Sequence, residues 1–204
     1  MKIKKEKSIY REYIEALVTA LVLALIIRTF VVQAFKIPSG SMIPTLLVGD
    51  HILVNKFIYG IQIPFTDKRI FAFNHPQRGD VVVFKFPQDP SRDFIKRVVA
   101  KGGDTVEVLN REVYVNKKKL DESYIQHSDN VENKDMVPRD NMSALTVPIN
   151  KIFVMGDNRD HSYDSRFWGF VDISAVRGEA LFIYWSWDKE KTSVRFRRIG
   201  RAIK

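Results

Sequence analysis

Two serines near the start of the chain have the side chains and the setting of a hydrolytic nucleophile. Ser39 and Ser41 flank Gly40, and prolines stand on either side at Pro38 and Pro44. Glycine permits backbone angles that other residues avoid, and proline fixes its own. Both hydroxyls are therefore expected on a stiff, irregular segment, where a serine becomes a nucleophile if a base removes its proton. Taken alone, a Ser-Gly-Ser sequence is more often an ordinary loop.

A candidate base lies in the stretch DFIKRVV, residues 93–99. If this stretch is a strand, Phe94, Lys96 and Val98 share one face and Arg97 points to the other. A lysine amine between apolar neighbours loses hydration, which lowers its pKa and suits it to act as a general base near neutral pH. The alternative is a lysine on the solvent face of an edge strand, and spacing alone favours that alternative.

A third stretch, GDNRDHSYDSRFWGFV at residues 156–171, is dense in charged and hydrogen-bonding side chains. Packing it between aromatic-rich strands requires that its charges pair and its hydroxyls find partners. We expect an ion pair between Asp164 and Arg166, and Ser162 to orient a neutral amine. A carboxylate-rich metal site is a rival hypothesis, which the arginines and the missing paired histidines disfavour. A Ser-His-Asp site built on His161 is the other rival, although a lone histidine in a polar loop is more often an ordinary polar residue.

The elements that position these residues begin with an apolar run over residues 16–35, which has the ~20 residues needed to span a bilayer. Residues 1–15 are a basic head, which predicts a cytoplasmic N-terminus and an extracytoplasmic domain at 36–204. Arg28 lies inside the run, near enough to its end to reach the headgroups. A cleavable signal peptide with a small-x-small site at 32–34 is the alternative, but its apolar core would be only ~7–15 residues long.

Short β-rich runs separated by turn residues fill the rest of the chain and predict a mainly β fold. We expect an antiparallel β domain of coiled or partly closed barrels, with a hairpin turn at Asn110-Arg111. Residues 121–150 read as a loop-rich insertion rather than a second core, and the basic tail is expected to close the fold. The predicted strands are DHILVNKFIY (50–59), DVVVFKF (80–86), FIKRVVA (94–100), TVEVL (105–109), EVYVN (112–116), IFVMG (152–156) and EALFIYWSW (179–187).

Bulk composition narrows the possible functions. The 204 residues allow one helical anchor and one domain, and a hydrophobic fraction of 45% suffices for a core. The net charge of +9 suits either nucleic acid or anionic lipid. The chain has no cysteine, which excludes disulfides, a thiolate nucleophile and a cysteine-based metal site.

Five stretches in order resemble the sequence boxes of the bacterial type I signal peptidases, membrane-bound serine endopeptidases that remove signal peptides. They cover most of the domain, leaving mainly residues 121–150 unmatched. These stretches are SGSMIPTL (39–46), GDHILVNKFIYG (49–60), RGDVVVFKFP (78–87), IKRVVAKGGD (95–104) and GDNRDHSYDSRFWGFV (156–171).

The resemblance implies a role for each matching residue. Ser41 would be the nucleophile and Lys96 its general base, while Ser39 would lend a hydroxyl to the oxyanion hole beside the Ser41 N–H. Ser162 would hydrogen-bond the lysine amine. Structural support is implied for Asp164 and Arg166, and the positions that line shallow apolar substrate pockets are Phe35, Ile37, Met42, Leu46, Ile52, Val83 and Ile95.

The resemblance also implies partners and leaves two rivals. The partners are preprotein signal peptides, cleaved after A-x-A-like sites, and membrane lipids; no metal, other cofactor or nucleic acid is implied. A self-cleaving repressor would carry a DNA-binding helical module where this chain has an apolar run. A catalytically silent, membrane-anchored β module that binds preproteins or lipid is the second rival, and the complete set of Ser39, Ser41, Lys96 and Ser162 argues against it.

Overall fold

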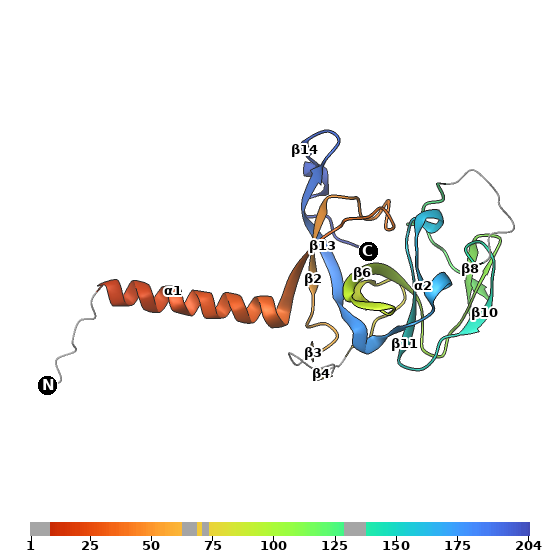
Figure 1. The fold of residues 1–204 in the computed structure, drawn as a ribbon, viewed down its shortest axis with the longest axis horizontal. Coiled ribbons are helices and arrows are strands. Elements are labelled where there is room, and N and C mark those ends of the chain that lie inside the picture. Colours follow the sequence, from red (N-terminus) through yellow and green to blue (C-terminus); the bar gives the residue numbers. More distant parts are fainter. Residues whose placement is uncertain (1–8, 63–68, 71–73, 129–137) are drawn as a thin grey trace.

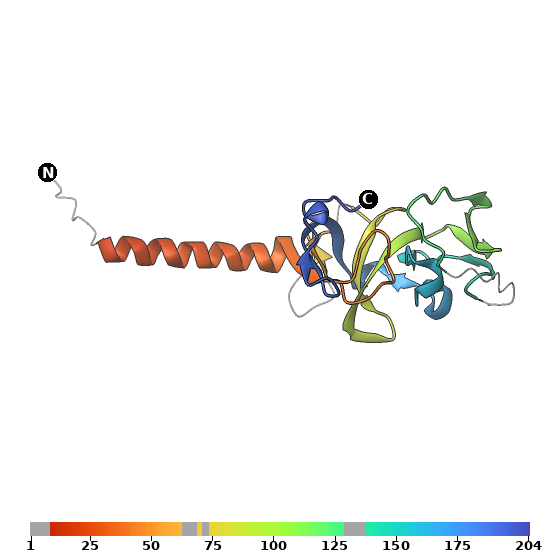
Figure 2. The same cartoon turned by 90° about the horizontal axis from the view of Figure 1, so that it is seen from above.

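The computed structural model describes residues 9–62, 69–70, 74–128 and 138–204 of the chain. Part of the predicted basic head (1–8) and part of the predicted insertion (129–137) lie outside these residues. A long N-terminal helix extends away from a β-rich body (Figures 1 and 2).

The N-terminal segment consists of α1 (Ile9–Ile26), a π-helical turn η1 (Ile27–Val31) and β1 (Val32–Lys36). Leucine and alanine favour the helix, and none of its residues is buried. The predicted span is too long at its C-terminal end, because residues 32–35 form β1 and pair with β2 (Asp50–Asn55). This pairing also includes residues 32–34, the small-x-small site on which the alternative of a cleavable signal peptide depends. Over the described ranges, no helix combines the length and the apolarity required to cross a membrane.

An antiparallel sheet of eight strands forms the centre of the body and runs in the order β1-β2-β13-β5-β6-β11-β12, with β14 added to β13. It is an open series between β1 and β12, so the expected mainly antiparallel β fold is confirmed, whereas the finer expectation of partly closed barrels is not shown. β1 was not predicted as a strand. The remaining strands of this sheet are β5 (Val81–Phe86), β6 (Asp89–Lys101), β11 (Lys151–Met155), β12 (Val171–Asp172), β13 (Val176–Asp188) and β14 (Ser193–Val194).

A second sheet of four strands lies at the other end of the body from α1 (Figure 1). Its order is β10-β7-β8-β9, and Asn110 and Arg111 form the predicted hairpin turn with φ of 50° and 70°. The prediction of a coreless insertion is wrong at its C-terminal end, because β10 pairs with β7 and Met142 joins a separate apolar core. The strands are β7 (Thr105–Leu109), β8 (Glu112–Val115), β9 (Lys118–Lys119) and β10 (Met142–Thr146).

The remaining elements are short. They are β3 (Ile61–Gln62), β4 (Arg69–Ile70), the 3₁₀ turns η2 (Arg159–His161), η3 (Ile173–Ala175) and η4 (Phe196–Arg198), and the helix α2 (Ser165–Trp168).

The central sheet is covered on both faces, so its middle strands are apolar on both sides. Along β5, Val81 and Val83 join one apolar cluster while Val82 and Phe84 join another. The C-terminal tail lies along β13, where the Ile203 N–H donates to the Leu181 carbonyl at 2.9 Å. This contact agrees with the expectation that the tail closes the fold.

Candidate active site

The segment with the two serines connects β1 to β2 and is fixed at both ends. The Ile37 N–H donates to the Asp50 carbonyl at 2.8 Å, and the Gly49 N–H donates to the Ile37 carbonyl at 3.0 Å. Met42 and Leu46 lie one helical turn apart, and both are buried. These apolar anchors hold Ser41 half-buried, while Ser39 is exposed.

The loop after β11 fastens the Ser41 backbone. The Asn158 N–H donates to the Ser41 carbonyl at 3.1 Å, and the Asn158 side chain donates to the Gly40 carbonyl at 3.2 Å. Gly156 permits this approach, because a Cβ there would collide with the Ser41 carbonyl oxygen and the Ser162 hydroxyl. The loop and the serine segment are therefore positioned as one unit.

Lys96 projects from β6 directly to Ser41. Its Nζ lies 2.8 Å from Ser41 Oγ and 2.9 Å from the Ile95 carbonyl oxygen, and 5.4 Å from the centre of the Phe94 ring. The residue is only 4% exposed, so the alternative of a solvent-facing lysine is wrong. Phe94 and Val98 pack in one cluster on the predicted shared face.

Burial governs the protonation of this amine. Loss of hydration lowers the pKa of Lys96 to about 8, while the charges of Asp164 and Asp157 act in the opposite direction. Among the described residues, Lys96 forms no ion pair. A neutral amine accepts a hydrogen bond from the Ser41 hydroxyl across the same 2.8 Å, whereas an ammonium donates one to Ser41 Oγ.

The predicted pair of Asp164 and Arg166 forms, and it organises the loop before α2. Arg166 Nε lies 2.9 Å from Asp164 Oδ1, and both side chains are buried. Asp164 also accepts from the Gly156 N–H at 3.1 Å. Burial alone would raise the pKa of Asp164, but the Arg166 charge and the hydrogen bonds it receives hold that pKa below its usual range.

Ser162 is buried next to Gly156 but does not bond to Lys96 in this structure. Its Oγ has no hydrogen-bond partner of good geometry among the described residues. It nevertheless lies close enough to Asp164 to contribute to the lowered pKa of that carboxyl. The expected hydrogen bond from Ser162 to the lysine amine is therefore not formed here.

A buried ion pair on the other face of β6 was not predicted. Arg97 Nε and Nη2 donate to the two Asp157 carboxylate oxygens at 2.8 and 2.7 Å. Arg97 Nη1 donates to the Gly79 carbonyl at 2.8 Å, and the Thr45 hydroxyl donates to Asp157. Thr45 lies four residues after Ser41, so this network ties the serine segment to β6 a second time.

The start of the predicted insertion packs on the same network. The Tyr124 ring lies 4.0 Å from the Arg97 guanidinium carbon, and Glu122 accepts from Arg159 Nη1 at 2.7 Å. The Gln126 backbone exchanges hydrogen bonds with the loop after β11 at 2.8 and 3.0 Å. The local sequence gave no signal for these contacts, because the partners lie at least 27 positions apart in the printed sequence.

The rival hypotheses of a histidine base and a metal site find little support in this geometry. His161 is exposed, whereas Ser41 Oγ is bonded to Lys96. Three aspartates of the polar loop are each paired with an arginine, as Asp157 with Arg97, Asp160 with Arg111, and Asp164 with Arg166. No group of three or more candidate metal ligands gathers within the described residues.

The seven positions expected to line substrate pockets lie together beside the site. All belong to, or pack on, one apolar cluster. Phe35 and Ile95 are half-buried, whereas the other five residues are buried, namely Ile37, Met42, Leu46, Ile52 and Val83.

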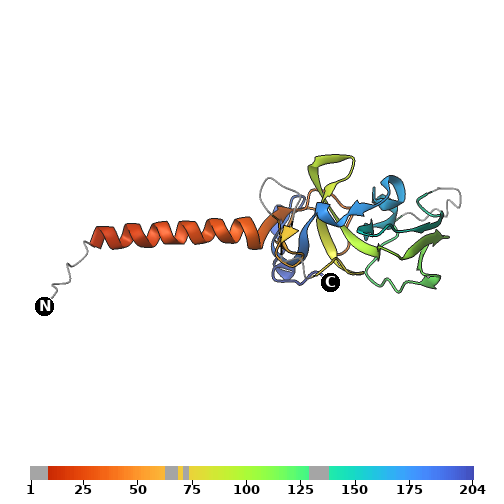
Figure 3. The ribbon, with the colours of Figure 1, turned by 90° about the horizontal axis from the view of Figure 1, so that it is seen from below.

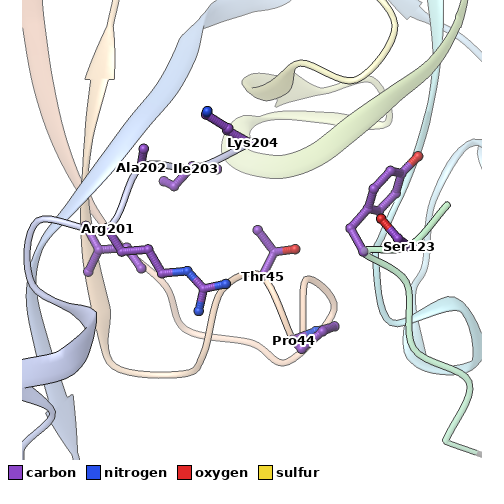
Figure 4. A pocket seen from close by; sticks show the side chains of 9 residues that line it. Pro44, Thr45, Ser123, Arg201, Ala202, Ile203 and Lys204 are labelled. Carbon is purple, nitrogen blue, oxygen red and sulfur yellow. The ribbon is translucent and has the colours of Figure 1, made fainter.

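A cavity of about 370 Å³ lies behind the serine segment (Figure 4). Pro44 and Thr45 face the tail residues Arg201 and Lys204 across it, and Ser123 lies on a third side. Its lining includes neither Ser41 nor Lys96, so this cavity is separate from the serine–lysine pair.

The chain is similar to several known proteins. The family described as "Signal peptidase, peptidase S26" matches residues 10–185. The signal peptidase I of Pseudomonas aeruginosa is 37% identical, with 93% of this chain and 78% of that protein covered. A probable signal peptidase I-1 of Synechocystis is 41% identical, with 84% and 81% covered. A crystal structure of a signal peptidase I from Enterococcus faecalis is 30% identical, covers 52% of this chain and 97% of that one, and has a TM-score of 0.41.

A family match over most of the chain and relatives of this identity over most of their own lengths establish the assignment. The chain belongs to the type I signal peptidases of the peptidase S26 family, and it is a serine endopeptidase that cleaves signal peptides.

Proposed function

We propose that Ser41 is the nucleophile of this peptidase and Lys96 its general base. The observation that carries the proposal is the 2.8 Å contact between Lys96 Nζ and Ser41 Oγ, made by an amine whose pKa burial lowers to about 8. A neutral amine at this distance removes the hydroxyl proton as Oγ attacks the scissile carbonyl carbon.

The remaining steps use the same two side chains. The ammonium formed on Lys96 gives its proton to the departing amine, which leaves an ester of Ser41 with the signal peptide. The neutral amine then deprotonates a water molecule, which hydrolyses the ester and restores the hydroxyl. Ser39, exposed two residues before Ser41, would donate its hydroxyl to the oxyanion beside the Ser41 N–H, where one donor is typically worth ~3 kcal/mol.

The apolar cluster beside the pair supports cleavage after small residues. Phe35 and Ile95 pack on the buried side chains of this cluster, which include Met42, the residue after Ser41. We assign this surface to the signal-peptide residues before the cut, where shallow apolar pockets accept alanine, as in A-x-A-like sites.

We also propose that α1 anchors the enzyme in the cell membrane, with lipid as its partner there. Its apolar side chains are exposed along its length, including Leu17, Leu21 and Leu25, as a lipid-covered helix requires. The lysines at 2, 4, 5 and 7 favour a cytoplasmic head (1–15), a membrane-inserted segment within 16–35 and an extracytoplasmic catalytic domain (36–204).

The serine–lysine assignment is tested with a model preprotein in detergent. Wild type is expected to release a product whose N-terminal sequence begins directly after the A-x-A site, and Lys96→Ala is expected to release none. Lys101→Ala is the matched control, because this lysine is exposed on the same strand. Full activity of a folded Lys96→Ala protein would refute the assignment.

The topology is tested by cysteine labelling, since the chain has no cysteine of its own. Single cysteines are introduced as Ser8→Cys and Lys191→Cys and exposed to a membrane-impermeant maleimide in intact spheroplasts. Labelling of Lys191→Cys alone is expected. Labelling of Ser8→Cys alone would reverse the topology, and labelling of both in sealed cells would exclude a single span.

A further inference from the structure

A row of aromatic side chains begins at Lys96 and ends on the surface. Phe94, 5.4 Å from Lys96 Nζ, stacks on Phe86 with ring centres 4.3 Å apart. Phe86 meets Tyr163 at 6.2 Å, and Tyr163 meets Phe167 at 5.6 Å. We call these four residues the aromatic shelf. Its outer members are open to solvent, with Tyr163 50% and Phe167 41% exposed.

Phe94 of the aromatic shelf and the proposed signal-peptide pockets pack on opposite faces of the central sheet. Phe94 packs with the cluster on one face of the sheet, whereas Ile95, the next residue on β6, packs with the pocket cluster on the other. Tyr163 directly follows Ser162, which borders Ser41 through Gly156. The aromatic shelf thus borders Lys96 through Phe94 and the Ser41 segment through the loop of Ser162, and none of its residues belongs to the pocket cluster. It is therefore a surface available to the residues that follow a scissile bond held at Ser41.

The position of the aromatic shelf argues against lipid as its occupant. α2, which carries Phe167, lies beyond β2 and β13 from α1 along the long axis of the molecule (Figures 1 and 3). If α1 lies in the membrane, this end of the body faces away from it. The occupant continuous with the reaction is the part of the substrate that leaves toward the mature protein.

We propose that the aromatic shelf binds the first two residues after the scissile bond and favours an apolar side chain there. This inference rests on the proposed serine–lysine site and adds a specificity determinant to it. Aromatic faces attract apolar and aromatic side chains, and a contact of this kind changes kcat/KM by about fivefold to tenfold. Tyr163 is the main contact, because it is the most exposed member and directly follows Ser162 in the loop that borders Ser41.

The test uses preproteins with one common signal peptide that differ only in the first or second mature residue, Leu or Ser. Wild type is expected to cleave the Leu substrate with about fivefold higher kcat/KM at one of these positions. Tyr163→Ala is expected to bring the ratio close to one while the Ser substrate keeps its rate within about twofold. Tyr163→Phe removes the hydroxyl that contacts Gln88 but keeps the ring, and it is expected to preserve the ratio.

Two further variants are used, a second substitution within the aromatic shelf and a control outside it. Phe167→Ala is expected to lower the ratio as well, and it replaces Tyr163→Ala if that protein fails to fold. Phe196→Ala removes an aromatic ring that is 75% exposed at η4, outside the aromatic shelf, and it is expected to leave the ratio unchanged.

Several outcomes would overturn the proposal. They are a wild-type ratio of one at both positions, an equal loss on both substrates in Tyr163→Ala, or an unchanged ratio in both shelf variants. Weaker binding of Tyr163→Ala to phosphatidylglycerol vesicles without any change in the ratio would make the surface a lipid contact instead. The serine–lysine assignment is tested separately: cleavage by Lys96→Ala would refute it, whatever the ratio between the Leu and Ser substrates.

Discussion

Lys96 and Arg97 are adjacent on β6, both cationic by type and both buried, yet their surroundings differ completely. Arg97 points into a network built for a charge, with both carboxylate oxygens of Asp157 and a backbone carbonyl as acceptors. Lys96 points to a hydroxyl, a carbonyl and an aromatic ring. The alternation of a single strand separates the two sites.

The contrast shows how one strand supplies both a proposed base and a buried ion pair that stabilises the structure. A buried guanidinium keeps its proton under all ordinary conditions, so it needs a fixed counter-charge and stabilises the structure only with one. Burial lowers the pKa of an amine that has no such partner, so that its neutral form becomes available near pH 8. We call Arg97 with its partners the arginine side, and Lys96 with its contacts the lysine side. The arginine side holds the loop that carries Asn158 against Ser41, whereas the lysine side can exchange a proton with the Ser41 hydroxyl.

The largest effect is expected where the lysine side is removed. Lys96→Ala and Ser41→Ala should each lower kcat/KM on a preprotein by about 10⁴-fold or more, since the members of a nucleophile–base pair act as a unit. The double variant should lose no more than either single one. Additive losses in the double variant would show that the two residues act independently, and circular dichroism checks that each variant is folded.

The next largest effect is expected in the pH dependence of kcat/KM, which should follow Lys96 and not Arg97. Because the neutral form of Lys96 is the base and its pKa is about 8, kcat/KM should rise about tenfold per pH unit below 8 and level off above it. From pH 5 to pH 8 this amounts to about 10³-fold. The ion pair of Arg97 with Asp157 takes no part in the proposed proton transfer. Lys101→Ala should keep the wild-type profile, and a flat wild-type profile would exclude an amine base.

The lowered pKa that favours catalysis also predicts that burying Lys96 reduces the free energy of unfolding near neutral pH. Unfolding returns Lys96 to its ordinary pKa of 10.5, so the unfolded chain binds more protons between about pH 8 and 10.5. This group therefore makes the free energy of unfolding rise with pH across that window. Lys96→Met removes the contribution and should stabilise the protein at pH 7 by up to about 3 kcal/mol, measured by urea denaturation. A loss of stability at pH 7 would show that the buried amine is not strained.

Breaking the arginine side should damage the fold. Asp157→Asn leaves Arg97 buried without a counter-charge, which should cost about 3–5 kcal/mol of unfolding free energy in urea. The matched control is Asp172→Asn, whose partner Lys151 lies 3.6 Å away on the surface, with an expected change within about 0.5 kcal/mol. Equal effects of the two changes would mean that burial does not distinguish them.

The contacts that could be predicted from the sequence join residues that lie close together in the chain. The shared face of Phe94, Lys96 and Val98 follows from strand alternation, and the pair of Asp164 and Arg166 lies two residues apart. The serine segment was identified from glycine and proline in one short stretch. The main strands were predicted from apolar runs, and the structure confirms them, although the strand predicted at 50–59 ends at Asn55.

The arginine side was missed because it joins distant parts of the chain. Arg97 meets Asp157 across 60 positions, and Glu122 meets Arg159 across 37, so no local pattern announces either pair. β1 was not predicted because its residues continue the apolar run of the predicted span. Composition alone does not distinguish the end of a helix from a strand that pairs with β2. Long-range pairing, not residue type, decided these elements.

The smallest effect is expected at Ser162, which borders the lysine side without bonding to it. Its hydroxyl is buried without a partner of good geometry among the described residues, so Ser162→Ala should leave the free energy of unfolding nearly unchanged or raise it slightly. If this hydroxyl orients the neutral amine during turnover, the variant should lower kcat by about tenfold with little change in KM, because the interaction forms only on the way to the transition state. Ser162→Thr, which keeps the hydroxyl, is the control and should recover part of the loss. A Ser162→Ala enzyme with wild-type kcat would assign the orientation of the amine to the two contacts that Lys96 already makes, with Ser41 and with the Ile95 carbonyl.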